Sequence, residues 1–109
     1  MKKLAKGNIL KNLPQNATEE VINIIHKNQN IRIEQIISSG QTSPAEGWYD
    51  QEENEWVILL QGNAHIEFEG AGIVLLRQGD HLLIDAHRKH KVIFTSKNPC
   101  CVWLAIFFQ

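Results

Sequence analysis

The sequence GWYDQEENEW, residues 47–56, places three large aromatic rings beside a run of acidic and amide side chains. A solvated loop gains little from the rings, and the core of a strand tolerates few carboxylates because burying an unpaired charge is costly. A small polar site with an apolar wall uses both kinds of side chain. The segment therefore predicts a binding or catalytic site to which it contributes the polar groups.

The elements that position this segment are predicted to be short strands. From residue 31 onward, apolar residues recur with a period of two, and clusters of Gly, Pro, Ser and Asn separate the runs. About seven such runs follow one another, which is typical of a β-sandwich or barrel. The side chains expected to face the interior are Val57, Leu59, Ala64, Ile66, Phe68, Val92 and Phe94, with His65 and Glu67 facing outward.

The N-terminal part is expected to differ from the rest. Residues 1–15 predict a separate polar segment that Pro14 ends. Asn16 followed by Glu19 resembles a capping box, and the apolar residues that come next suit one face of a helix. Residues 16–28 are therefore predicted to form a short α-helix.

The composition indicates one domain and limits the classes of partner. A chain of 109 residues suffices for one hydrophobic core, so residues 1–109 are expected to be a single domain. A net charge of −1 argues against nucleic acid, and no long apolar stretch suggests a secretion signal or a membrane span. The two cysteines, Cys100 and Cys101, are adjacent and form no disulfide framework, which favours the cytoplasm.

Two motifs, in this order, resemble those of the cupin superfamily. The first cupin motif reads G-x5-H-x-H-x3/4-E-x6-G, and Glu55 and Gly62 match its end. The second reads G-x5-P-x-G-x2-H-x3-N, and Gly79 and His90 match its first glycine and its histidine. The resemblance implies an all-β fold, a jelly-roll β-barrel over residues 31–109 that follows the short N-terminal helix.

The first motif departs from the family in its two histidines. With three residues before Glu55, the histidine positions become Tyr49 and Gln51, and with four they become Trp48 and Asp50. We favour Tyr49 and Gln51, since the other register would point an indole at the metal position. In cupins these two histidines, the glutamate and the second-motif histidine hold a divalent metal ion inside the barrel.

The resemblance therefore implies a divalent metal ion (Fe, Ni, Zn or Mn) bound by Gln51, Glu55 and His90. Tyr49 would be a fourth ligand or a hydrogen-bond donor, and either His90 or Tyr49 could transfer a proton in catalysis. Two further candidates are His87, three residues before His90, and Asp50 of the other register. The alternative is a metal-free barrel in which His90 simply pairs with Glu55.

Three functional hypotheses follow. The first is a metal-dependent enzyme of the dioxygenase, isomerase or lyase type that acts on a small polar organic molecule. The second is a non-catalytic module that binds a small metabolite, with or without metal, and the third is a metal-free structural protein. A homodimer is expected in each case, because Trp56, Ile58 and Leu60 form an apolar stripe opposite the cavity face.

Overall fold

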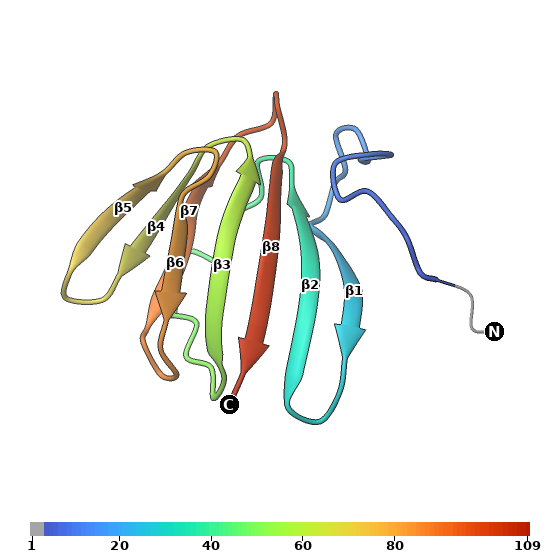
Figure 1. The fold of residues 1–109 in the computed structure, drawn as a ribbon. Helices are drawn as coiled ribbons and strands as arrows, with labels where there is room; N and C mark the ends of the chain where they lie inside the picture. The colour runs from blue at the N-terminus through green and yellow to red at the C-terminus, as the bar shows by residue number, and fades with distance from the viewer. Residues whose placement is uncertain (1–3) are drawn as a thin grey trace.

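The computed structural model describes residues 4–109, which form eight strands in two antiparallel sheets (Figure 1). The five-stranded sheet has the order β1-β2-β8-β3-β6, and the three-stranded sheet has the order β5-β4-β7. The described residues contain no helix, and hence none that could cross a membrane. The strands are β1 (Val21–Lys27), β2 (Ile31–Ser38), β3 (Asn54–Gln61), β4 (Ala64–Phe68), β5 (Gly72–Leu76), β6 (His81–Ile84), β7 (His90–Thr95) and β8 (Cys101–Phe108).

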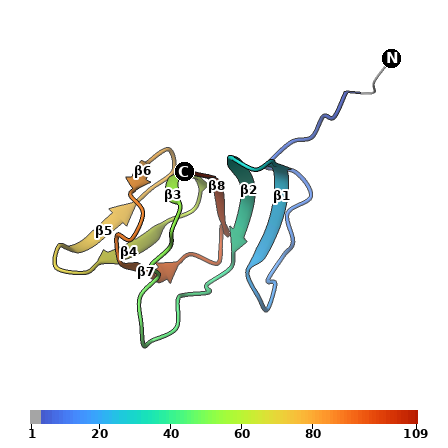
Figure 2. The ribbon, with the colours of Figure 1, turned by 90° about the horizontal axis from the view of Figure 1, so that it is seen from below.

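The seven strands from residue 31 onward confirm the all-β prediction. Strand β8 lies between β2 and β3, and its inward side chains Trp103, Ala105 and Phe107 are buried in the main core cluster. Viewed from below, the three-stranded sheet lies opposite part of the five-stranded sheet, while β1 and β2 stand away from it (Figure 2). The barrel is therefore more open on the β1–β2 side.

The helix predicted over residues 16–28 is wrong, because Val21–Lys27 forms strand β1. This strand pairs antiparallel with β2, and the NQN sequence makes the turn between them. In that turn Asn28 Oδ1 accepts hydrogen bonds from the backbone N–H groups of Asn30 and Ile31 at 2.8 and 2.9 Å. The β-branched residues of this segment favour an extended chain once a partner strand is available.

The interior register is confirmed for most of the predicted side chains and wrong for Phe94. Val57, Leu59, Ala64, Ile66 and Phe68 are buried, and Val92 is half-buried.

Phe94 faces outward because β7 carries a bulge. Its pairing with β4 shifts between His65 and Ile66, so that Phe94 pairs with His65 and Val92 with Ile66. The extra residue turns Phe94 to the outer surface, where it is 42% exposed and its ring lies 4.8 Å from that of His65. Thr95 takes the inward position that follows and is buried.

The outer face of the five-stranded sheet is apolar and only partly covered. Near one end, Leu60 packs with Ile9 and Leu13 of the N-terminal segment against a buried cluster of Ile37, Cys100 and Val102. Further along the same face, Trp56 and Ile58 are half-buried, and Leu83 of the neighbouring strand β6 is 59% exposed. The N-terminal segment therefore covers part of the face predicted to bind a second copy.

The homodimer remains a prediction, which light scattering at micromolar concentration can test. We expect twice the mass of one chain for the wild type and the mass of one chain for Ile58→Lys, because a charge on the apolar face opposes its burial. Ile73→Lys is the matched control, since Ile73 is exposed on β5 of the other sheet and should leave the dimer intact. A wild type with the mass of one chain would contradict the prediction.

The motif glycine Gly62 is expected to be irreplaceable in the turn between β3 and β4. It has a φ of +95°, and a Cβ there would lie 2.8 Å from Ser96 Oγ and 2.9 Å from Cys101 Sγ. Gly70 also has a positive φ, +77°, but a Cβ there would meet nothing within 4 Å. Because both variants carry the backbone strain and only one adds a clash, Gly62→Ala should lower the free energy of unfolding by about 1–3 kcal/mol more than Gly70→Ala. If denaturant unfolding shows that the two variants lose the same free energy of unfolding, the atoms around Gly62 move to relieve the clash.

Candidate functional site

A cavity of about 540 Å³ lies between the two sheets and opens beside β1. Its floor is the inner face of β2, β8 and β3, where Trp103, Phe107 and Val57 contribute apolar surface. The opposite wall comes from β7 and from the loop that connects β2 to β3. Of the predicted site residues, Tyr49, Gln51, Glu55 and His90 line this one cavity.

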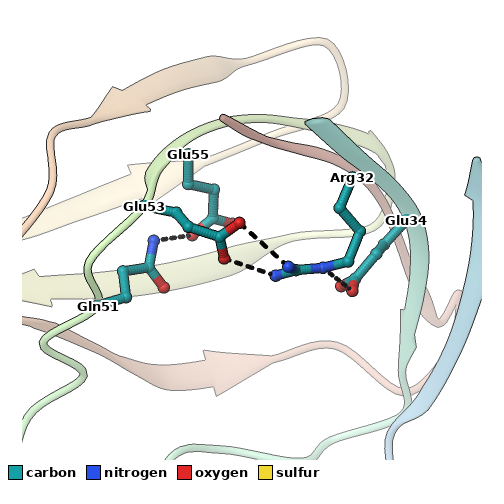
Figure 3. Close-up of polar contacts among 5 residues, drawn as sticks. All are labelled: Arg32, Glu34, Gln51, Glu53 and Glu55. Carbon is teal, nitrogen blue, oxygen red and sulfur yellow. Dashed lines mark hydrogen bonds and ion pairs between the residues drawn. The ribbon is translucent and has the colours of Figure 1, made fainter. Parts of the chain in front are cut away.

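Glu55 reaches the cavity because it lies at the start of β3 on its inward face. It pairs with Phe107 of β8 on one side and with Ile84 of β6 on the other. Gln51, from the preceding loop, donates a hydrogen bond from Nε2 to Glu55 Oε1 at 3.1 Å (Figure 3). The Gln51 backbone carbonyl accepts from the N–H of His87 at 2.8 Å, which ties this loop to the segment that leads into β7.

Burial raises the pKa of Glu55 above its ordinary value, because removal from water disfavours the charged form. The hydrogen bond from Gln51 opposes this rise, since it stabilises the carboxylate. The negative charges of Glu34 and Glu20 push the pKa further up, and the positive charge of Arg32 lowers it. The balance favours a protonated Glu55 over a wider range of pH than for an exposed glutamate.

His90 begins β7 and is buried, with 4% of its surface exposed. Its Nδ1 lies 2.8 Å from the backbone carbonyl of Arg88, and a carbonyl can only accept. Nδ1 therefore carries a proton, and in the neutral ring Nε2 carries a lone pair. Ser39 Oγ is the only fully buried, unbonded side-chain polar atom in residues 4–109, so Nε2 is open to the cavity that His90 lines.

Tyr49 is held against His90 by its backbone. The N–H of Tyr49 donates to the carbonyl of His90 at 2.8 Å, and the N–H of His90 donates back at 3.2 Å. The two rings lie 5.8 Å apart, and the Phe68 ring lies at the same distance on another side of the imidazole. Tyr49 is about half exposed, which places it at the mouth of the cavity.

His87 and Asp50 lie away from the other candidates. His87 Nδ1 and Asp50 Oδ1 are 2.7 Å apart, and both side chains are largely exposed. Neither residue lines the cavity. They bind each other on the outer side of the loop that presents Tyr49 and Gln51.

An ion-paired group beside the cavity was missed by sequence reasoning. Arg32 Nε contacts Glu34 Oε2 at 2.7 Å, and its Nη2 contacts Glu53 Oε1 at 3.0 Å (Figure 3). The guanidinium lies 4.3 Å from the centre of the Phe107 ring. The alternation of Ile31, Arg32, Ile33 and Glu34 could have indicated two charged side chains on the inward face of β2.

The donors in the cavity are sufficient for at most a weak metal site. Within residues 4–109 no three His, Cys, Asp or Glu side chains gather in a group that could hold a metal ion. The predicted set contains two such residues, Glu55 and His90, with Gln51 as an amide donor. This set fits a divalent ion only if the Gln51 carbonyl oxygen and water complete the coordination.

The comparisons with known proteins agree with this architecture. The family model described as the cupin domain matches residues 34–107. The chain is a cupin. No match is found among curated proteins.

Three solved structures illustrate the relationship of this cupin to others. A crystal structure from Ralstonia eutropha JMP134, named as a "putative mannose-6-phosphate isomerase", shares 36% identity, covers 97% of this chain and 99% of its own, and has a TM-score of 0.93. An RmlC-like cupin from Desulfovibrio desulfuricans shares 18% identity and has a TM-score of 0.72. The match covers 96% of this chain and 97% of that chain. An RmlC-like cupin with a double-stranded β-helix fold from Methanocaldococcus jannaschii shares 12% identity and has a TM-score of 0.68. The match covers 88% of this chain and 85% of that chain. The last two support the fold alone.

The raised pKa of Glu55 predicts a pH-dependent effect of Glu55→Gln in chelator-treated protein. An acid whose pKa is higher in the folded state contributes stability that is complete below its unfolded pKa, near 4.5, and is lost as the pH rises through the folded value. The amide imitates the protonated acid, so the variant should unfold at a higher temperature than the wild type at neutral pH. This advantage should disappear toward pH 4.5. A wild type that is the more stable protein at neutral pH would show that Glu55 is ionised and well paired.

Proposed function

We propose that this cupin binds a small polar organic molecule in its cavity and acts on it with a divalent metal ion held by His90, Glu55 and Gln51. The observation that carries the proposal is the orientation of His90. Its Nδ1–H is held by a backbone carbonyl and its Nε2 faces the cavity, as in most metal-binding histidines. Glu55 would supply a carboxylate oxygen and Gln51 its carbonyl oxygen, which still accepts while the amide nitrogen donates to Glu55.

The chemistry expected in this cavity is of the isomerase, lyase or dioxygenase type. When bound, a divalent ion would act as a Lewis acid toward an oxygen of the substrate. Tyr49, beside His90 at the mouth, is then the residue positioned to move a proton, and in the absence of metal His90 Nε2 is the base. The name of the similar Ralstonia protein supports the isomerase class. We do not extend its phosphorylated substrate to this cupin, since no Lys or Arg is found among the described lining residues.

A second candidate is a non-catalytic module that binds a metabolite without metal. The hydrogen bond from Gln51 to Glu55 and the raised pKa of Glu55 favour it, because both reduce the need of this buried acid for a cation. In either case we expect the protein to act in the reducing cytoplasm, since Cys100 and Cys101 are both buried free thiols.

Elemental analysis of untagged protein equilibrated in turn with iron, nickel, zinc and manganese tests the metal. His90→Ala should abolish binding, because it removes the one histidine among the described residues that line the cavity. Gln51→Ala should weaken binding, since water can replace a neutral oxygen, and Gln51→His should strengthen it by adding an imidazole.

The matched control is His65→Ala, which removes an outward-facing histidine of the neighbouring strand β4 and should change nothing. If the wild type binds metal and His90→Ala retains all of it, the ligand assignment is wrong. If the wild type binds none of the four metals, the metal-dependent proposal is wrong.

A further inference from the structure

Hydrogen-bond donors and acceptors are unevenly distributed around the cavity. On its β1–β2 side, Trp103 Nε1–H donates to Ser38 Oγ at 3.2 Å. The Ser38 hydroxyl in turn donates to Glu20 Oε2 at 3.1 Å. Two donors are thus used within the protein, and the series ends on a carboxylate at the edge of the cavity.

The same pattern recurs on the other sides. The Gln51 amide nitrogen donates to Glu55, and that of Gln41 donates to the carbonyl of Ala17 at 2.8 Å. His90 uses its Nδ1–H on a carbonyl and turns its bare Nε2 to the cavity. Each amide keeps one further N–H, and the hydroxyl groups can both donate and accept, but the carboxylates and His90 Nε2 that remain for a ligand are acceptors.

The charges that line the cavity are of one sign. Four glutamates line the cavity, Glu19, Glu20, Glu34 and Glu55, and no described lining residue is a lysine or arginine. Glu34 is paired with Arg32 and the pKa of Glu55 is raised by burial, so Glu19 and Glu20 carry the unpaired negative charge. Arg32, next to Glu34, faces inward beside the cavity without lining it, and it is already bound to two carboxylates. An anionic ligand would meet repulsion here without an opposing cation.

His90 supplies an observation that is independent of these carboxylates. The residue is 4% exposed, and its Nε2 has no hydrogen-bond partner among the described residues. Nε2 is thus an acceptor that is open to the cavity and has no partner in the described part of the protein, so a ligand that brings a donor could bind it. Trp103 and Phe107 supply the apolar wall, and the rings of Trp103 and Tyr49 supply aromatic faces that favour a cation, whereas one face of Phe107 is already taken by Arg32.

We propose that the ligand of this cavity is a small organic cation, an amine with a short apolar chain, rather than an anion such as a sugar phosphate. Its ammonium hydrogens would bind the carboxylates of Glu20 and Glu34, and its chain would lie against Trp103 and Phe107. This inference rests on the proposed function, that the cavity binds a small organic molecule, but it does not require the metal.

Three compounds with the same four-carbon chain test the sign of the charge. Putrescine, butanediol and succinate are titrated calorimetrically into chelator-treated protein at neutral pH, so that the result is independent of any metal. Putrescine should bind at least about tenfold more tightly than butanediol, or about 1.4 kcal/mol, and succinate should not bind. The affinity for putrescine should fall as salt is added, because Glu20 is exposed to solvent and its attraction for the ligand is screened.

Variants locate the binding. Glu20→Gln and Glu34→Gln should each weaken putrescine binding about tenfold, since each removes one charge from the cavity. Glu69→Gln is the matched control, because it removes an exposed carboxylate from the turn after β4, outside the lining. Putrescine binding that is unaffected by either cavity variant, or is absent, overturns the proposal.

Mannose and mannose 6-phosphate separate this inference from the proposed function. Neither compound should compete with putrescine. Mannose 6-phosphate should bind no more tightly than mannose, because the described residues that line the cavity offer no cation for the phosphate. If butanediol or mannose binds and putrescine does not, the cavity binds organic molecules but the charge inference is wrong. Tighter binding of mannose 6-phosphate than of mannose overturns the inference in the same way.

Discussion

Strand β8 is the constraint on which the cavity depends, because it joins strands that are distant in the sequence. It pairs with β2 on one side and β3 on the other, so that Phe107 lies between Arg32 and Glu55. Two residues along, Ala105 lies between Glu34 and Val57. Since all of these side chains face inward, the charged residues of β2 and the acid of β3 share one floor. Without the C-terminal strand between them, these groups would not face the same space.

The polar groups on this floor remain buried only because they have partners. Removing a carboxylate from water costs several kcal/mol unless it is paired or protonated. Glu34 is paired with Arg32, whereas Glu55 has only the amide of Gln51 and a raised pKa. The protein thus satisfies its carboxylates with its own donors, and the acceptors that remain determine what a ligand must bring.

The cupin fold and the chemistry of this cupin are separable. The barrel, the turn at Gly62 and the position of His90 follow the pattern that the family motifs imply. The first motif departs from this pattern, because Tyr49 and Gln51 stand at its two histidine positions. His90 is therefore the one histidine among the described residues that line the cavity. A fold carries many functions, so the balance of donors, acceptors and charge in the cavity is a better guide to the ligand than the family.

The sequence by itself determined the strands that have one apolar and one polar face. It also indicated several of the residues that line the cavity. Alternation placed Ala64, Ile66 and Phe68 inside, and motif spacing brought Gln51, Glu55 and His90 together. The alternation is a local pattern, which a chain carries wherever it folds, whereas the motif spacing relates distant residues through the family resemblance.

Only the tertiary structure decided the features that depend on a partner strand. Val21–Lys27 is a strand because β2 offers it an edge, although its apolar pattern also suits a helix. A bulge in the pairing of β7 with β4 turns Phe94 outward, and no local pattern marks the extra residue. The proton on His90 Nδ1 and the ion pairs of Arg32 likewise depend on contacts made after folding. Pairing and register are set by contacts between distant segments, and local periodicity does not contain them.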